Sequence, residues 1–85
     1  MNTKEAMVLF KYYLQSNHKQ RTIESYRLLL ERFEVIYAQR DLEDIPPDEI
    51  FHFLENLTGN MAKSTRRLRY AQLKAFYNFI IDRCS

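Results

Sequence analysis

The stretch from residue 63 to residue 81, KSTRRLRYAQLKAFYNFII, carries the side chains best suited to bind a charged partner. A basic stripe recurs at steps of three and four residues and so shares one side of a helix: Lys63, Arg66, Arg67, Tyr70 and Lys74. We expect Ser64 to cap this helix, with Thr65 in its first turn. Arg66 and Arg67 oppose the helix macrodipole, at a cost of about a few tenths of a kcal/mol each. A bound anion would reverse the sign of that cost.

The opposite side of this helix is apolar and predicts a core-facing surface. By helical spacing it holds Leu68, Ala71, Ala75, Phe76, Phe79 and Ile80, with Leu73 at its edge.

No pattern in the sequence indicates catalysis or a metal site. The two histidines, His18 and His52, lie on different predicted elements, and with the single cysteine they cannot supply the usual four ligands of zinc. The chain has no glycine-rich phosphate loop and no nucleophile motif. His18 and Arg21 form H-x-x-R, a spacing used in some DNA strand-transferases, but no second arginine and tyrosine stand in a matching frame. We therefore expect no catalytic residue, no metal and no cofactor.

Composition favours one small all-α domain. The chain has 85 residues, 46% of them hydrophobic, and only one glycine and two prolines for turns. Cys84 cannot form an internal disulfide, which suits a reducing compartment. No apolar run approaches the roughly 18 residues of a membrane span, and the N-terminus is too quickly polar for a signal peptide. We expect a cytoplasmic protein without a membrane partner.

Charge is unevenly distributed along the chain, whose net charge is +2. Residues 1–40 hold seven Lys/Arg and four Asp/Glu, residues 41–60 hold six Asp/Glu and no Lys/Arg, and residues 61–85 hold six Lys/Arg and one Asp/Glu. A polarised chain of this kind can present a positive face although it is nearly neutral overall, which bears on its partners and not on its fold.

Apolar periodicity predicts a compact bundle of four helices, near residues 3–15, 22–39, 47–57 and 64–82. The faces expected to be buried hold Ala6, Leu9, Phe10, Tyr13 and Leu14 in the first helix, Ile23, Tyr26, Leu29, Leu30, Phe33, Ile36 and Tyr37 in the second, and Ile50, Phe53, Leu54 and Leu57 in the third. Phe33, Leu54, Leu73 and Phe76 should be largely buried.

Residue types at the predicted helix ends indicate how the helices begin and stop. Asn2 or Thr3 should cap the first helix and Thr22 the second, while Pro47 should open the third and Gly59 can take the left-handed position after it. Glu49 and Glu55 are interpreted as first-turn and solvated charges, not as an acid/base pair. Val8 and Tyr12 fall off the first helix's apolar face, either in a wide bundle contact or in a contact with another subunit.

Three segments show a recurrent order and spacing. They are Thr22-Ile23-x-x-Tyr26 followed by Phe33, the stretch from Ile45 to Leu57, and Ser64-Thr65-x-Arg67 leading into Leu73-x-x-Phe76-Tyr77. Together they resemble the N-terminal SAM-like, core-binding domain of tyrosine recombinases, the phage integrase family. The resemblance covers nearly the whole chain.

This resemblance implies a small helical bundle that forms one half of a C-shaped clamp on DNA. A separate C-terminal domain would carry the Arg/His/Arg/Tyr chemistry, and this chain stops where the linker to it would begin. The implied partners are double-stranded DNA, that catalytic domain and further recombinase protomers, in the cytoplasm at the nucleoid. By position, the residues facing the DNA groove would be Lys19, Arg21, Thr22, Arg66, Arg67 and Tyr70.

The basic stripe therefore has several interpretations. The first is sequence-tolerant binding of duplex DNA, with Lys and Arg neutralising phosphates and Tyr70 or Thr22 near base edges. The second is a protein-interaction module whose stripe meets an acidic partner and whose Val8 and Tyr12 meet an apolar one. RNA binding and a merely solvated helix face are weaker alternatives, and a stand-alone enzyme is not expected.

Overall fold

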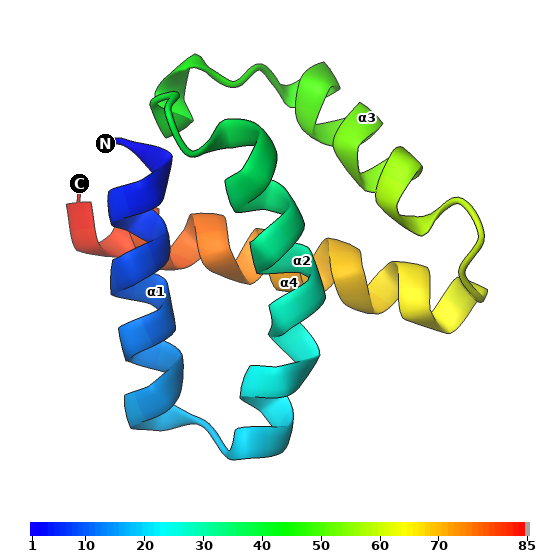
Figure 1. The fold of residues 1–85 in the computed structure, drawn as a ribbon, viewed down its shortest axis with the longest axis horizontal. Helices are drawn as coiled ribbons and strands as arrows, with labels where there is room; N and C mark the ends of the chain where they lie inside the picture. Colours follow the sequence, from blue (N-terminus) through cyan, green and yellow to red (C-terminus); the bar gives the residue numbers. More distant parts are fainter. Residues whose placement is uncertain (85) are drawn as a thin grey trace.

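The computed structural model describes residues 1–84, and the chain folds into α1 (Thr3–Asn17), α2 (Gln20–Tyr37), a short 3-10 turn η1 (Leu42–Asp44), α3 (Pro47–Thr58) and α4 (Lys63–Cys84). Figure 1 shows α1 and α2 as an antiparallel hairpin, with α4 crossing behind both and α3 lying beside the first half of α4. Over the described residues the structure contains no strand beyond one isolated bridge between Asn2 and Asp41. The predicted all-α bundle of four helices is confirmed.

One phenylalanine from each helix meets at the centre of the bundle. Phe76 of α4 packs edge-on against Phe10 of α1 and Phe33 of α2, with ring centroids 5.3 and 5.9 Å apart. Phe53 of α3 reaches Phe33 at 5.3 Å in the same geometry. Edge-to-face pairs of this kind each add about 0.5–1.5 kcal/mol beyond the area they bury. The cluster therefore fixes how all four helices cross.

The predicted core is confirmed at its centre. Phe33 and Phe76 are 0% exposed, Leu73 2% and Leu54 5%. Val8 and Tyr12 are exposed, at 63% and 72%, so the wide bundle contact that was one of the two alternatives for them is wrong.

Four residues expected in the core lie on the surface instead. Leu9, Ile36 and Leu68 are exposed, and so is Ala71, whereas Met7 is fully buried. In α4 the predicted register is wrong because polar side chains take inward positions.

Polar side chains hold the first half of α4 against α2. Arg69 donates from Nη1 to the backbone oxygen of Ser25 at 2.6 Å, and Gln72 donates from Nε2 to Ser25 Oγ at 2.9 Å. Gln72 is consequently buried. Because polar groups can be buried when they are hydrogen-bonded, this half of α4 turns Arg69 and Gln72 inward and Leu68 and Ala71 outward.

The helix starts are partly as predicted. Asn2 caps α1, since its side chain accepts from the backbone N–H of Lys4 at 2.8 Å, and Pro47 opens α3. The caps predicted at Thr22 and Ser64 are wrong, because the helical bonds begin earlier: Lys19 is the N-cap residue of α2, and α4 begins at Lys63.

The helix end at Gly59 also differs from the prediction. Gly59 has φ −54° and ψ −32°, which is right-handed, so its freedom to adopt positive φ is not used. The chain turns through the bond from the Met61 N–H to the Thr58 oxygen. A buried hydrogen bond from Thr58 Oγ1 to the Leu54 oxygen stabilises this turn.

The acidic segment between α2 and α3 is pinned to the rest of the molecule. Arg40 binds Glu49 at 2.5 Å and the backbone oxygen of Asp44 at 3.0 Å, while the N-terminal ammonium of Met1 binds Glu43 at 2.6 Å. Glu49 is thus a first-turn charge with a partner.

No helix over residues 1–84 is long and apolar enough to cross a membrane. The expectation about the thiol of Cys84 concerns a side chain outside the described part of the structure.

Candidate nucleic-acid interface

The outer side of α4 carries a row of three cations, Lys63, Arg67 and Lys74, which we call the α4 cation row. All three are exposed, and by helical spacing they lie on one side of the helix. None of their side chains forms a hydrogen bond or ion pair with any residue from 1 to 84. Their charge is therefore directed to solvent.

Two members of the predicted basic stripe lie at the edge of this row and have a partner. Arg66 Nη2 lies 3.2 Å from Glu55 Oε2, and the Tyr70 hydroxyl donates to Glu55 Oε1 at 2.8 Å. The hydrogen bond to Glu55 and partial burial raise the pKa of Tyr70 above its ordinary value. Glu55, expected to be a solvated charge, instead bridges α3 to α4.

Arg66 and Tyr70, together with Lys63 and Arg67, line an open groove of about 450 Å³ at the start of α4. Its lining of three cations and one phenol is suited to an anionic ligand.

A second groove brings the start of α2 next to α4. We call it the α2–α4 groove. It has a volume of about 420 Å³ and is lined by Arg21, Thr22, Ser25, Tyr26, Leu68, Ala71 and Gln72. Ala71 lies one turn from both Arg67 and Lys74 on α4. Arg21 and Thr22 therefore lie across a shallow depression from the α4 cation row.

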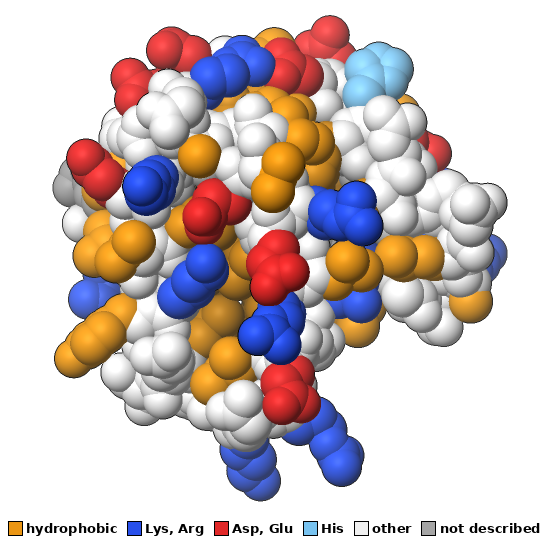
Figure 2. All heavy atoms as spheres, viewed as in Figure 1, with side chains coloured by type: hydrophobic (Ala, Val, Ile, Leu, Met, Phe, Trp, Pro, Cys, Tyr) orange, Lys and Arg blue, Asp and Glu red, His pale blue; other side chains and the backbone are white. Residues whose placement is uncertain are grey.

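Lys19 precedes α2 in the connection from α1 and is exposed. It lines neither of the two grooves on α4, so the structure groups it with the others less closely than the sequence suggested. Figure 2 shows basic side chains projecting beyond the body at the end where this connection lies.

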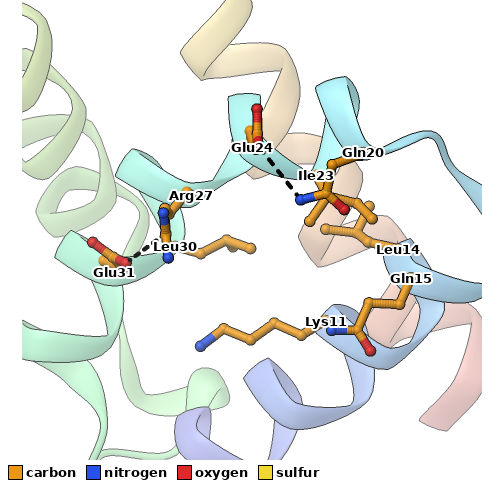
Figure 3. A pocket seen from close by; sticks show the side chains of 9 residues that line it. All are labelled: Lys11, Leu14, Gln15, Gln20, Ile23, Glu24, Arg27, Leu30 and Glu31. Carbon is orange, nitrogen blue, oxygen red and sulfur yellow. Dashed lines mark hydrogen bonds and ion pairs between the residues drawn. The ribbon is translucent and has the colours of Figure 1, made fainter.

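The side of the molecule formed by α1 and α2 differs from the outer side of α4. Figure 2 shows acidic and basic side chains interspersed over it. Lys11 binds Glu34 and Arg27 binds Glu31, each at 3.2 Å. Between the two helices a groove of about 380 Å³ has an apolar floor and a rim of both charge signs (Figure 3). Cations paired in this way do not make a field that attracts a polyanion.

No metal centre is formed by the described residues. Over residues 1–84, no three His, Cys, Asp or Glu side chains lie close enough together to hold a metal ion.

Comparison with known proteins agrees with the architecture. Residues 7–83 match the family model described as "Phage integrase, N-terminal SAM-like domain". No curated protein and no solved structure is significantly similar to the chain. The match covers most of the 85 residues and confirms the resemblance noted from the sequence. The chain belongs to the family of N-terminal SAM-like domains of phage integrases.

Proposed function

We propose that this chain is the DNA-binding module of a site-specific tyrosine recombinase. It grips duplex DNA through the outer side of α4 and the start of α2 and holds it for a C-terminal catalytic domain. The observation that carries the proposal is the α4 cation row, whose three charges have no partner among residues 1–84, whereas Lys11 and Arg27 on the α1–α2 side are paired.

The contacts divide by chemistry. Lys63, Arg67 and Lys74 neutralise phosphates, and the planar guanidinium of Arg67 can bind two phosphate oxygens at once. Arg21 reaches a phosphate from the opposite rim of the α2–α4 groove, and Lys19 extends the contact along the backbone. The Thr22 hydroxyl and the exposed Leu68 line the α2–α4 groove, so a base edge or a thymine methyl that enters this groove would meet them. Most of the affinity is therefore independent of sequence.

The chain alone is not the enzyme. We expect it neither to cleave nor to join DNA, since strand transfer belongs to the catalytic domain and to the assembly of further recombinase protomers on DNA. A nicked suicide substrate tests this directly, and a covalent adduct with any of the six tyrosines would contradict it.

Salt-dependent binding tests the proposed grip. Fluorescence anisotropy with a labelled random duplex of about 20 base pairs should give a micromolar or weaker Kd at physiological salt. If about three to five phosphates are neutralised, log K should fall with log salt at a slope of roughly −3 to −4.5. Replacing the α4 cation row by alanine should abolish most of this binding and flatten the slope by about three times 0.9.

A control with the same change in charge separates contact from general attraction. It replaces Lys4, Lys11 and Arg27, on the α1–α2 side, by alanine, and should weaken binding only slightly. Equal losses in both triple variants would contradict the proposed face. Unchanged affinity and slope in the α4 variant would favour the alternative, a helical interaction module whose basic face meets an acidic protein.

A further inference from the structure

Glu55 and Arg66 each carry a charge at the unfavourable end of a helix. Glu55 lies in the last turn of α3 and Arg66 in the first turn of α4, where the helix dipoles oppose their charges. The ion pair between them offsets both penalties. It also places a carboxylate at the edge of the basic groove at the start of α4.

The two oxygens of Glu55 occupy the position that an anionic ligand would take. One accepts from the Tyr70 hydroxyl at 2.8 Å and the other lies 3.2 Å from Arg66 Nη2. Arg66 and Tyr70 are one helical turn apart, so a guanidinium and a hydroxyl donor converge on a single acceptor group. A non-bridging pair of phosphate oxygens offers the same charge and acceptor pattern.

We propose that Glu55 is a built-in competitor of DNA phosphate at Arg66 and Tyr70, so that a phosphodiester binds there only by displacing the carboxylate. This inference rests on the proposed function. The side chains of Arg66 and Glu55 are 40% and 38% exposed, and solvent-screened pairs of this kind are weak enough for a phosphate to exchange with one partner. The α4 cation row needs no such exchange.

The competitor lowers non-specific affinity in a defined way. While Glu55 binds Arg66, the free domain offers one cation fewer to DNA. Once a phosphate has displaced Glu55, the freed carboxylate is repelled by the DNA backbone. Tight engagement then requires enough other contacts to release Glu55. Glu55 thus sets how many phosphates the module contacts.

The test compares anisotropy titrations of the chain with the random duplex, with Glu55→Gln as the main variant and Glu55→Ala as a second one without an amide. Glu31→Gln is the matched control, because it removes the same charge and also releases an arginine, Arg27, on the α1–α2 side. Thermal melting by circular dichroism checks that each variant is folded.

We expect Glu55→Gln and Glu55→Ala to tighten binding by about tenfold at low salt and to steepen the salt slope by about 0.9, one additional phosphate. Glu31→Gln should change affinity less than about twofold. Arg66→Ala should change the duplex affinity of the natural chain little. Added to Glu55→Gln, it should cancel the gain in affinity.

Two results would overturn the inference. One is an equal gain from Glu55→Gln and Glu31→Gln, which would be a general charge effect. The other is that Arg66→Ala weakens duplex binding equally in the natural chain and in the Glu55→Gln variant. Failure of the proposed function looks different, because then none of these proteins binds the duplex with a salt-dependent affinity.

Discussion

The two halves of α4 are held in place by different physics. The second half is fixed by aromatic burial: Phe76 is fully buried, and Phe79 packs on Tyr13 and Phe10 with ring centroids 4.7 and 5.4 Å apart. The first half is fixed by polar contacts, from Arg69 and Gln72 to α2. One helix thus combines an apolar anchor with a polar, cation-bearing segment.

This difference explains how a small domain can display charge without losing its fold. In the first half, Arg69 and Gln72 face inward and orient the helix through hydrogen bonds. The α4 cation row on the opposite side of the helix can therefore face outward. We expect the aromatic half to contribute most of the stability, because it buries the larger side chains. Mutations in the two halves should therefore separate folding from binding.

The largest expected effect is in the apolar half. Phe76→Ala should destabilise the fold by about 3–5 kcal/mol, because it removes a ring that packs against Phe10 and Phe33 and leaves a cavity. That is a large share of the roughly 5–15 kcal/mol of a typical domain. Urea denaturation measures it, with the exposed Ile81→Ala in the same half as control. A Phe76→Ala protein that melts within a degree or two of the natural chain would contradict this packing.

A smaller effect is expected from the polar anchor. Arg69→Met keeps the length of the side chain but removes the bonds to the Ser25 oxygen at 2.6 Å and to Gln72 Oε1 at 3.0 Å. Hydrogen bonds to charged groups of this kind are worth about 1.5–3 kcal/mol. The neighbouring Leu68→Ala should cost under about 1 kcal/mol, since Leu68 is exposed. If Leu68→Ala destabilised the fold more than Arg69→Met, Leu68 would have to lie in the core.

The smallest effect concerns the phenol of Tyr77, in the second half of α4. The Tyr77 hydroxyl is buried and has no hydrogen-bond partner in the described part of the chain, and burial raises the pKa of Tyr77 from 10 to about 12. The folded state therefore favours the neutral phenol, so its contribution is complete below pH 10 and is lost as the pH rises toward 12.

Thermal melts of the natural chain and Tyr77→Phe at several pH values check this. At neutral pH the variant should be as stable as the natural chain or slightly more so, because an unpaired buried hydroxyl is removed. Between pH 10 and about pH 12 the Tm of Tyr77→Phe should fall less steeply than that of the natural chain. Parallel curves for the two proteins would show that Tyr77 does not titrate with unfolding.

Helical periodicity predicted the fold because most apolar side chains do face the core. The positions of Phe33, Leu54, Leu73 and Phe76 followed from spacing alone, and so did the existence of all four helices. Periodicity failed where a polar residue replaces an apolar one at an inward position. Gln72 is buried because Ser25, distant in sequence, supplies its partner, and no local pattern encodes that contact.

The candidate site could be predicted only in part for the same reason. The spacing of Lys63, Arg67 and Lys74 placed them on one side of α4, since this depends on the helix alone. The partner of Arg66 depends on how α3 meets α4, so Glu55 could not be assigned to it from the sequence. A weak signal was present, namely that Arg66 opposes the dipole of its own helix and needs an anion nearby.

Mapping of backbone amide shifts by nuclear magnetic resonance is the most direct test that α4 and the start of α2 grip DNA, because it reports which helix meets the duplex. When the random duplex is titrated into the labelled chain, we expect the largest amide shift changes in the α4 cation row and around the α2–α4 groove. We expect none at Val8, Tyr12 or Glu31. Shifts that concentrate on α1, or on the α1–α2 side, while the α4 cation row stays unmoved would contradict this expectation.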